Sequence, residues 1–320
     1  MQGSASSAEG QGFVPHPFRA ALRHCAHCPG SHTGELPCRA SATTKARAWL
    51  LVEHPGPWAD KVERTDLPAP VAAAVAEAAR RGVRTQLIRR PDRRREVPQF
   101  QVYAGWSGQG APAWLEGRRL ADPVEMAFLD LAAVAAGRRH GLGEPTGPLL
   151  LVCAHGRHNA CCARAGGPLA RALHAQYGPE VWETTHVGGD RYAANLVCLP
   201  HGLYYGDLGI DEGLTAAAAY REGRVVLDHL RGRAGLPEPA QAAEHQVREH
   251  TGVLDVDAVD VESMTGDDRV YAVVVRAWNE RYRVTVRPGL SHGPCGPGCD
   301  ENRRTYLCDP PNLLNRAALV

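Results

Sequence analysis

The fold class that we predict depends mainly on the stretch Pro148–Cys162, which reads PLLLVCAHGRHNACC. Its first part, PLLLVC, is a continuous apolar run of the kind found in buried strands. A polar loop, AHGRHNA, follows it. From Cys162 to Tyr177 apolar residues such as Leu169 and Leu173 recur on one face of an amphipathic helix. A buried strand that leads through a loop into a helix is typical of an α/β sheet.

The elements that follow extend this unit to a mixed sheet. Val181–His186 is the next predicted strand, Ala194–Leu199 and Leu203–Tyr205 form a predicted hairpin turned at Pro200–Gly202, and a predicted helix runs from Asp211 to about Leu230. This order of elements is that of a thioredoxin-like layer, in which a parallel pair is followed by an antiparallel hairpin and helices cover the sheet. We therefore predict an α/β fold with a thioredoxin-like mixed sheet and flanking helices over residues 146–235.

Residues 21–145 are predicted to form a second α/β region that precedes this sheet. The predicted strands are Ala48–Glu53, Arg84–Arg89 and Gln99–Ala104, and the predicted helices are Pro70–Arg81 and a segment capped by Asp122 that reaches about Arg139. The order of these elements resembles that of the middle region. Because the two regions share no motif, we favour coincidence over a diverged duplication.

The remaining segments are predicted to be a small module and two tails. Gly232–Pro239 is rich in Gly and Pro and predicts a linker. A small α+β module is expected over residues 236–288, with a helix at Ala240–Thr251 and short strands at Val253–Val261, Val270–Ala277 and Tyr282–Arg287. Residues 1–20 are small and polar and predict a disordered tail, and residues 289–320 predict a tail rich in Cys, Gly and Pro.

Composition excludes several classes of protein. Hydrophobic residues make up 44% of the chain and charged residues 22%, which is typical of soluble globular proteins. The 36 Lys and Arg nearly balance the 35 Asp and Glu, which argues against nucleic acid as a partner. No stretch approaches the roughly 18–20 apolar residues of a membrane helix, and the first residues lack the pattern of a secretory signal. We expect a cytoplasmic protein with no membrane partner.

The chain has ten cysteines, which fall in three groups along the sequence. In a reducing compartment, groups of cysteines indicate metal or thiol chemistry rather than disulfides. Cys153 ends a predicted strand and Cys162 opens the next helix, at the sheet edge where open α/β sheets usually carry out chemistry. The free N–H groups of a helix N-terminus favour a thiolate. At the end of the following strand, His186 precedes two glycines that allow a tight turn in HVGGD.

Three motifs together resemble the sucrase/ferredoxin-like family, which belongs to the thioredoxin-like ferredoxins. They are CAHGRHNACC from Cys153, THVGGDRYAANLVCLPHGLYYG from Thr185 to Gly206 and RAWLLVEHPGPW from Arg47 to Trp58, within a resemblance that spans about Cys25 to Arg287. The resemblance implies a [2Fe–2S] cluster held by two cysteines of a C-x8-C loop and two histidines of an H-x-G-G-H motif. Cys153, Cys162 and His186 match three of these ligands.

The fourth ligand position departs from the family pattern, because Asp190 stands where the second histidine would be. We expect Asp190 to be the fourth ligand, although carboxylate is a less usual cluster ligand than thiolate or imidazole. Cys198 is the alternative, and His155 and His158 in the loop are further candidates. The remaining possibility is that this branch of the family has lost the cluster.

The resemblance implies an iron–sulfur electron-transfer protein that exchanges single electrons with a redox partner, a reductase or an oxidase. The alternatives are a thiol–disulfide oxidoreductase that uses Cys153 or Cys162 as nucleophile, and a cluster-based redox sensor or binding protein. Gly166 and Gly167 lack the spacing of a dinucleotide fingerprint, so electrons would come from a partner rather than from a bound nicotinamide or flavin. We expect an electron carrier more than a stand-alone enzyme.

Two outer groups of cysteines are candidate zinc ligands. Cys25, Cys28 and Cys38 have the spacing of three ligands, with a neighbouring histidine, His24, His27 or His32, as a fourth. A second set, or the completion of the first, would come from Cys295, Cys299 and Cys308. Thiols of flexible tails explain both groups equally well, and thiol redox chemistry at Cys25 and Cys28 is a third interpretation.

Overall fold

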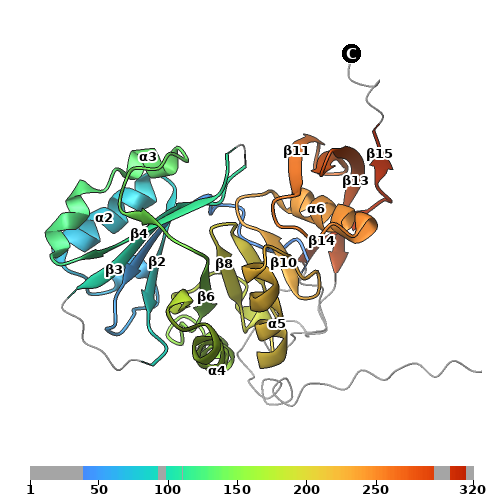
Figure 1. Ribbon diagram of the computed structural model, residues 1–320. Coiled ribbons are helices and arrows are strands. Elements are labelled where there is room, and N and C mark those ends of the chain that lie inside the picture. Colours follow the sequence, from blue (N-terminus) through green and yellow to red (C-terminus); the bar gives the residue numbers. More distant parts are fainter. Residues whose placement is uncertain (1–38, 93–98, 110, 292–302, 315–320) are drawn as a thin grey trace, which may run out of the picture.

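The computed structural model describes residues 39–92, 99–109, 111–291 and 303–314 (Figure 1). These residues fold into two sheets with helices packed against them. The larger is a mixed sheet of ten strands in the order β10-β9-β8-β6-β7-β2-β1-β3-β4-β5, and the smaller is antiparallel with five strands. The predicted mixed α/β architecture is therefore confirmed. No helix in the described ranges is long and apolar enough to cross a membrane.

The first half of the large sheet comes from the region predicted over residues 21–145. Its elements are β1 (Ala48–Glu53), η2 (Val62–Arg64), α2 (Ala69–Arg80), β2 (Val83–Arg89), β3 (Phe100–Trp106), β4 (Trp114–Leu120), η3 (Pro123–Phe128), α3 (Leu131–Ala135) and β5 (Glu144–Pro145). Strand β1 lies parallel to β2 and antiparallel to β3, and β3 lies antiparallel to β4. The three strands and the first helix expected in this half are confirmed, with ends that shift by up to two residues.

The single helix predicted from Asp122 to Arg139 is wrong. Asp122 does cap a helix, and its side chain forms a capping box with Glu125, but this first helix is a 3-10 segment that ends at Phe128. Leu129 leaves the helical region with φ −72° and ψ 117°. Asp130 then caps the separate helix α3 by accepting a hydrogen bond from the backbone N–H of Ala133 at 2.9 Å.

The second half of the large sheet contains the predicted thioredoxin-like region. Its elements are β6 (Leu149–Cys153), α4 (Ala160–Tyr177), η4 (Gly178–Glu180), β7 (Val181–Thr184), η5 (Asp190–Tyr192), β8 (Leu196–Leu199), β9 (Leu203–Tyr205), α5 (Ile210–Arg221) and β10 (Leu230–Arg233). Helix α4 begins two residues before Cys162, because the side chain of Asn159 caps it by accepting from the N–H of Cys161 at 3.0 Å. Cys162 therefore lies in the first turn of α4.

Two predictions after the hairpin are wrong. Helix α5 ends at Arg221 rather than near Leu230, because Gly223 adopts the left-handed conformation that terminates helices, with φ +74°. The segment predicted as a linker from Gly232 begins inside β10, a buried strand that pairs antiparallel with β9. A Gly- and Pro-rich composition therefore does not mark a flexible connection at this point.

The two halves have the same arrangement of strands and join edge to edge. In the second half β6 lies parallel to β7 and antiparallel to β8, and β8 lies antiparallel to β9, as their counterparts do in the first half. The halves meet where β2 pairs antiparallel with β7, with Ile88 opposite Thr184. Arg89 and Glu183 form a largely buried ion pair across this junction, with 2.7 Å between Nε and Oε2. The division into domains at residue 145 stays a prediction, because one sheet spans it.

The C-terminal module packs one helix on the smaller sheet. Its elements are α6 (Glu238–Thr251), β11 (Val259–Gly266), β12 (Tyr271–Ala277), β13 (Glu280–Ser291), β14 (Arg303–Cys308) and β15 (Asn312–Leu313). Apolar residues of α6, such as Ala243 and Val247, pack against the inward-facing valines of β12 and β13. The tail predicted after residue 288 is wrong for residues 303–308, which pair with β13 as a strand. The disordered tail predicted for residues 1–20 lies outside the described residues.

Candidate metal centre

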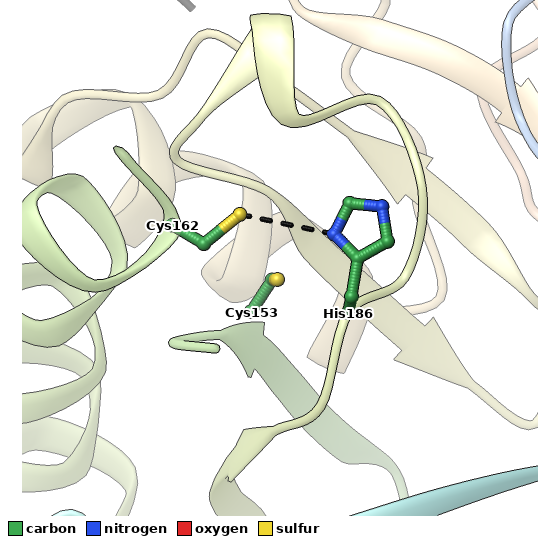
Figure 2. A group of neighbouring side chains, drawn as sticks. All are labelled: Cys153, Cys162 and His186. Carbon is green, nitrogen blue, oxygen red and sulfur yellow. Dashed lines mark hydrogen bonds between the residues drawn. The ribbon is translucent and has the colours of Figure 1, made fainter. Parts of the chain in front are cut away.

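Three of the predicted site residues converge at one edge of the large sheet (Figure 2). Cys153 is the last residue of β6, Cys162 lies in the first turn of α4, and His186 follows the end of β7 by two residues. Strands β6 and β7 are parallel, so their carboxyl ends meet at the same edge. One potential ligand atom of each side chain lies within 4.8 Å of the others.

The local sequence explains how the two cysteines come together. Gly166, one turn after Cys162, has no side chain to separate α4 from β6, and a Cβ atom at this position would overlap the carbonyl oxygen of Cys153. The close approach of helix and strand therefore requires glycine. Cys153 and Cys162 are buried, with exposed fractions of 1% and 0%. Water is thus kept away from the two sulfur atoms.

His186 is held in place by its backbone. Its N–H donates to Nδ1 of His155 at 3.1 Å, and its carbonyl oxygen accepts from Arg84 Nη2 at 3.2 Å. The Nε2 of His155 lies 2.5 Å from the carbonyl oxygen of Ala59. Because Nδ1 accepts, Nε2 must carry the proton and donate, so both nitrogens of His155 have a partner. His155 positions His186 and is not available as the fourth ligand that the sequence allowed.

The three side chains interact with one another. The Sγ of Cys162 lies 3.8 Å from Nδ1 of His186, the ring nitrogen that faces the sulfur atoms in Figure 2. A hydrogen bond with Cys162 lowers the pKa of Cys153 well below its usual value, and hydrogen bonding to His186 lowers it further. The same hydrogen bond with Cys153 raises the pKa of Cys162, and burial adds to this effect. The interaction therefore makes Cys153, rather than Cys162, the cysteine of the pair that loses a proton more readily.

Asp190 lies beside this group rather than within it. It is the first residue of η5, and its Oδ2 accepts a hydrogen bond from Nδ2 of Asn159 at 2.5 Å. Its negative charge contributes to the raised pKa of Cys162. The carboxylate thus sits at the N-terminus of α4, next to the residue that caps the helix. Its role as fourth ligand stays a prediction.

Cys198 is not brought to this group. Its strand β8 pairs with β6 so that Cys198 stands opposite Leu150, and side chains alternate between the faces of a sheet. Leu150 and Cys198 pack in one hydrophobic cluster with α4, whereas Cys153 and Cys162 pack in another on the opposite face. Burial raises the pKa of Cys198. This placement depends on the register between β8 and β6, which spacing along the chain does not give.

The predicted zinc ligands lie mostly outside the described residues. This holds for Cys25, Cys28, Cys38, Cys295 and Cys299. Cys308 is described and ends β14 in the smaller sheet, where burial raises its pKa to about 11. A zinc site formed by these residues stays a prediction.

The donor set and its surroundings fit a metal or an iron–sulfur group. Two thiols and an imidazole are soft ligands of the kind that bind iron–sulfur clusters, zinc or copper. A buried polar atom on the same face also has no partner among the described residues, namely the hydroxyl of Tyr204. Tyr204 is fully buried and packs in the same cluster as Cys153, and burial raises the pKa of its hydroxyl, with a smaller contribution from the charge of Cys153. A buried hydroxyl of this kind is suited to donate to a sulfur atom.

Three residues support the site in ways that the sequence did not predict. They are His155, Asn159 and Gly166. Asn159 could have been found, because an asparagine just before a predicted helix is a common N-cap. The other two act through contacts with Ala59 and with the backbone of Cys153, which depend on the folded chain.

Comparison with known proteins gives one result that bears on identity. Neither the curated proteins nor the solved structures contain a significant match to the chain. A family model described as sucrase/ferredoxin-like matches residues 40–232. The match covers more than half of the chain, nearly all of the large sheet and all three converging side chains. The chain belongs to the sucrase/ferredoxin-like family.

Proposed function

We propose that this chain is an electron-transfer protein that holds a [2Fe–2S] cluster at Cys153, Cys162 and His186. The observation that carries the proposal is the convergence of these three donors, within 4.8 Å of one another, at a buried sheet edge. Membership of a family whose description includes ferredoxins supports it. Such a cluster accepts and releases one electron at a time, and its ligands and hydrogen bonds set its potential.

We further propose that the second half of the large sheet is a thioredoxin-like unit. Its four central strands lie in the order β7-β6-β8-β9, with one parallel and two antiparallel pairs. Helix α4 connects the parallel pair, and its first turn carries one of the cysteines. The order and directions agree with the layer predicted from the sequence, which supports this interpretation.

Each residue of the site has a distinct role in this proposal. The lowered pKa of Cys153 helps this residue to bind a metal as a thiolate. Cys162 loses its proton when the metal binds, and His186 binds through Nδ1. Asp190 supplies the fourth donor, because it occupies the matching position in the motif. The contact with Asn159 keeps this carboxylate close to the first turn of α4.

The first experiment is to measure iron and sulfide in protein purified without oxygen from a host able to assemble clusters. We expect about two irons per chain, with the visible absorption and EPR signal of a [2Fe–2S] protein. Cys153→Ser, Cys162→Ser and His186→Ala should lose the signal. Cys198→Ser is the matched control and should keep it, because Cys198 packs on the opposite face. A colourless, iron-free wild-type protein would refute the proposal.

A second pair of variants tests the fourth ligand. Asp190→Ala should lower the iron content or change the spectrum. Asp190→His restores the H-x-G-G-H motif and should retain the cluster. Its reduction potential should rise, because a neutral imidazole replaces a carboxylate. Unchanged spectra in both variants would show that Asp190 is not a ligand.

One observation favours a thiol–disulfide oxidoreductase as the second candidate. The lowered pKa of Cys153 beside Cys162 is typical of a reactive dithiol pair. The complete burial of both residues argues against it, because a nucleophilic cysteine has to reach its substrate. Rapid reaction of iron-free protein with a thiol reagent, together with reduction of a disulfide substrate, would support this second function.

A further inference from the structure

The candidate metal centre reaches the surface on its histidine side. Cys153 and Cys162 are buried, whereas His186 is half-buried and lines a cavity of about 280 Å³. The same cavity is lined by His155, His158 and residues of η2, α2 and β2. An approaching molecule therefore meets imidazole edges before it meets a sulfur atom.

His158 extends this histidine side to the solvent. Its ring stacks on that of His186, with 3.7 Å between the ring centroids and 19° between the planes. The side chain lies in the exposed part of the loop between β6 and α4. Its Nδ1 lies 3.1 Å from the carbonyl oxygen of Asp60, which fixes the ring. The stack thus joins a proposed ligand to an exposed residue through two rings in van der Waals contact.

Stacking excludes His158 as a ligand of the same metal atom in this arrangement. A ring nitrogen binds a metal in the plane of its ring, at roughly 2.0–2.1 Å. The planes of His158 and His186 are nearly parallel and the ring centres are 3.7 Å apart. One atom cannot lie in both planes at that bond length, so His158 has a different role from that of His186.

We propose that electrons enter and leave the centre through His186 and His158, and that the exposed ring of His158 is the point of contact with a one-electron redox partner. This inference rests on the proposed function. In each event the partner is oxidised by one electron and the centre is reduced by one, or the reverse. No bond forms or breaks. The stacked rings shorten the path that the electron crosses between the partner and the buried sulfur atoms.

The charges around the two stacked rings indicate what charge the docking surface of the partner should carry. The cavity is lined by two acidic residues, Asp60 and Glu63, and by two basic residues, Lys61 and Arg84, so neither sign dominates. Long-range steering by charge is therefore weak, and association should depend little on salt. We infer a partner that docks a small, neutral surface over His158 rather than a strongly acidic or basic one.

The test compares rates of oxidation of the reduced, iron-loaded protein by cytochrome c in stopped flow; this basic protein serves as a one-electron acceptor and not as a stand-in for the inferred neutral partner. His158→Ala removes the stack, His158→Phe keeps a flat ring, and Arg157→Gln changes the exposed neighbour as a control. Measurements at roughly 0.5 M salt suppress charge effects. We expect His158→Ala to be several-fold slower, and the other two variants to stay close to wild type. Iron content, absorption spectrum and reduction potential should be the same in all four proteins.

Two results would overturn the inference while leaving the proposed function intact. An unchanged rate in His158→Ala would show that electrons take another path. A changed spectrum or lost iron in that variant would show that His158 is a ligand. Absence of iron in the wild type is a different result, because it would refute the proposed function itself. The stack can also be tested in metal-free protein, where His186→Ala should shift the NMR signals of the His158 ring.

Discussion

Gly166 of α4 lies against the backbone of Cys153 at the end of β6, so closely that a Cβ atom on Gly166 would overlap the Cys153 carbonyl oxygen. Cys162 lies one helical turn before Gly166, on the same side of α4. The distance between the two sulfur atoms therefore depends on how closely the helix approaches the strand. A motif of two cysteines separated by eight residues is not sufficient without this glycine.

Substitution of Gly166 should therefore damage both the fold and the metal site. In Gly166→Ala the helix has to move away from β6, which we expect to destabilise the protein by about 1–3 kcal/mol. Metal retention should fall as well, because Cys162 moves with the helix. Gly167→Ala is the control, since a Cβ at Gly167 would make only an ordinary contact with Arg171. Thermal unfolding and metal content should separate the two variants, and equal behaviour would contradict this account of α4.

Tyr204→Phe should leave the metal-free protein as stable as wild type or more stable, and should lower the reduction potential of the iron-loaded protein. In the metal-free protein the buried hydroxyl has no partner among the described residues, so its removal should be neutral or stabilising, by up to about 1 kcal/mol. In the loaded protein the hydroxyl would donate to a sulfur atom and favour the more negative, reduced state. Loss of a hydrogen bond of about 1 kcal/mol should lower the reduction potential by roughly 40 mV. An unchanged potential would place this hydroxyl outside the centre.

Arg231 should stabilise the glycine turn that follows His186. Its Nη1 donates to the carbonyl oxygen of Gly188 at 2.9 Å and to Oδ1 of Asn195 at 2.7 Å, and its Nη2 donates to the carbonyl oxygen of Ser41. Lysine cannot reproduce this planar set of donors, so Arg231→Lys should cost about 1–3 kcal/mol.

Exposed Arg224 provides the control for Arg231, because Arg224→Lys should change stability by less than about 0.5 kcal/mol. Urea unfolding of both variants measures the difference. Iron retention in the Arg231 variant should also fall, since the turn carries Asp190. Full stability and full iron content after Arg231→Lys would show that the turn holds its shape without the guanidinium group.

The sequence predicted the parts of the fold that depend on local pattern. The apolar run before Cys153 and the run from Ala48 to Glu53 are buried strands because nearly every residue in them is apolar. Strand β10 was missed because its sequence, LRGR, has no apolar pattern. Arg231 and Arg233 are buried there only because carbonyl and carboxylate groups from distant segments accept their hydrogen bonds. Such partners cannot be deduced from spacing along the chain.

In the candidate metal centre too, the sequence predicted what local motifs determine and missed what depends on contacts between distant segments. Cys153, Cys162 and His186 lie together as expected, because the motif fixes both cysteines at one strand–helix loop and the histidine at the end of the neighbouring strand. Cys198 was a poor alternative because its orientation depends on the register between β8 and β6. The role of His155 depends on Ala59, which is 96 residues away in the chain. Long-range contacts of this kind decide which of several nearby histidines remains free to bind.

The C-terminal module carries a buried histidine whose protonation should destabilise the fold. His245 lies in α6 with 5% of its surface exposed, and its Nδ1 has no partner in the described part of the chain. Burial, with the positive charge of Arg39 and Arg248, lowers its pKa to about 4. In the unfolded chain the pKa returns to about 6.5. The neutral form is therefore favoured by folding.

The sign of the pH effect follows from these two pKa values. Above pH 6.5 both states are neutral at His245 and its contribution to stability is fully present. As the pH falls from about 6.5 to 4 the unfolded chain binds a proton that the folded chain excludes, and stability is lost, by up to about 3 kcal/mol. His245→Leu should remove this loss, whereas His250→Gln, at an exposed position on the same helix, should not. Urea unfolding at pH 7, 6 and 5, roughly one pH unit apart within the window set by these pKa values, measures how the free energy of unfolding changes with pH. The same pH dependence in wild type and His245→Leu would show that His245 does not titrate differently on folding.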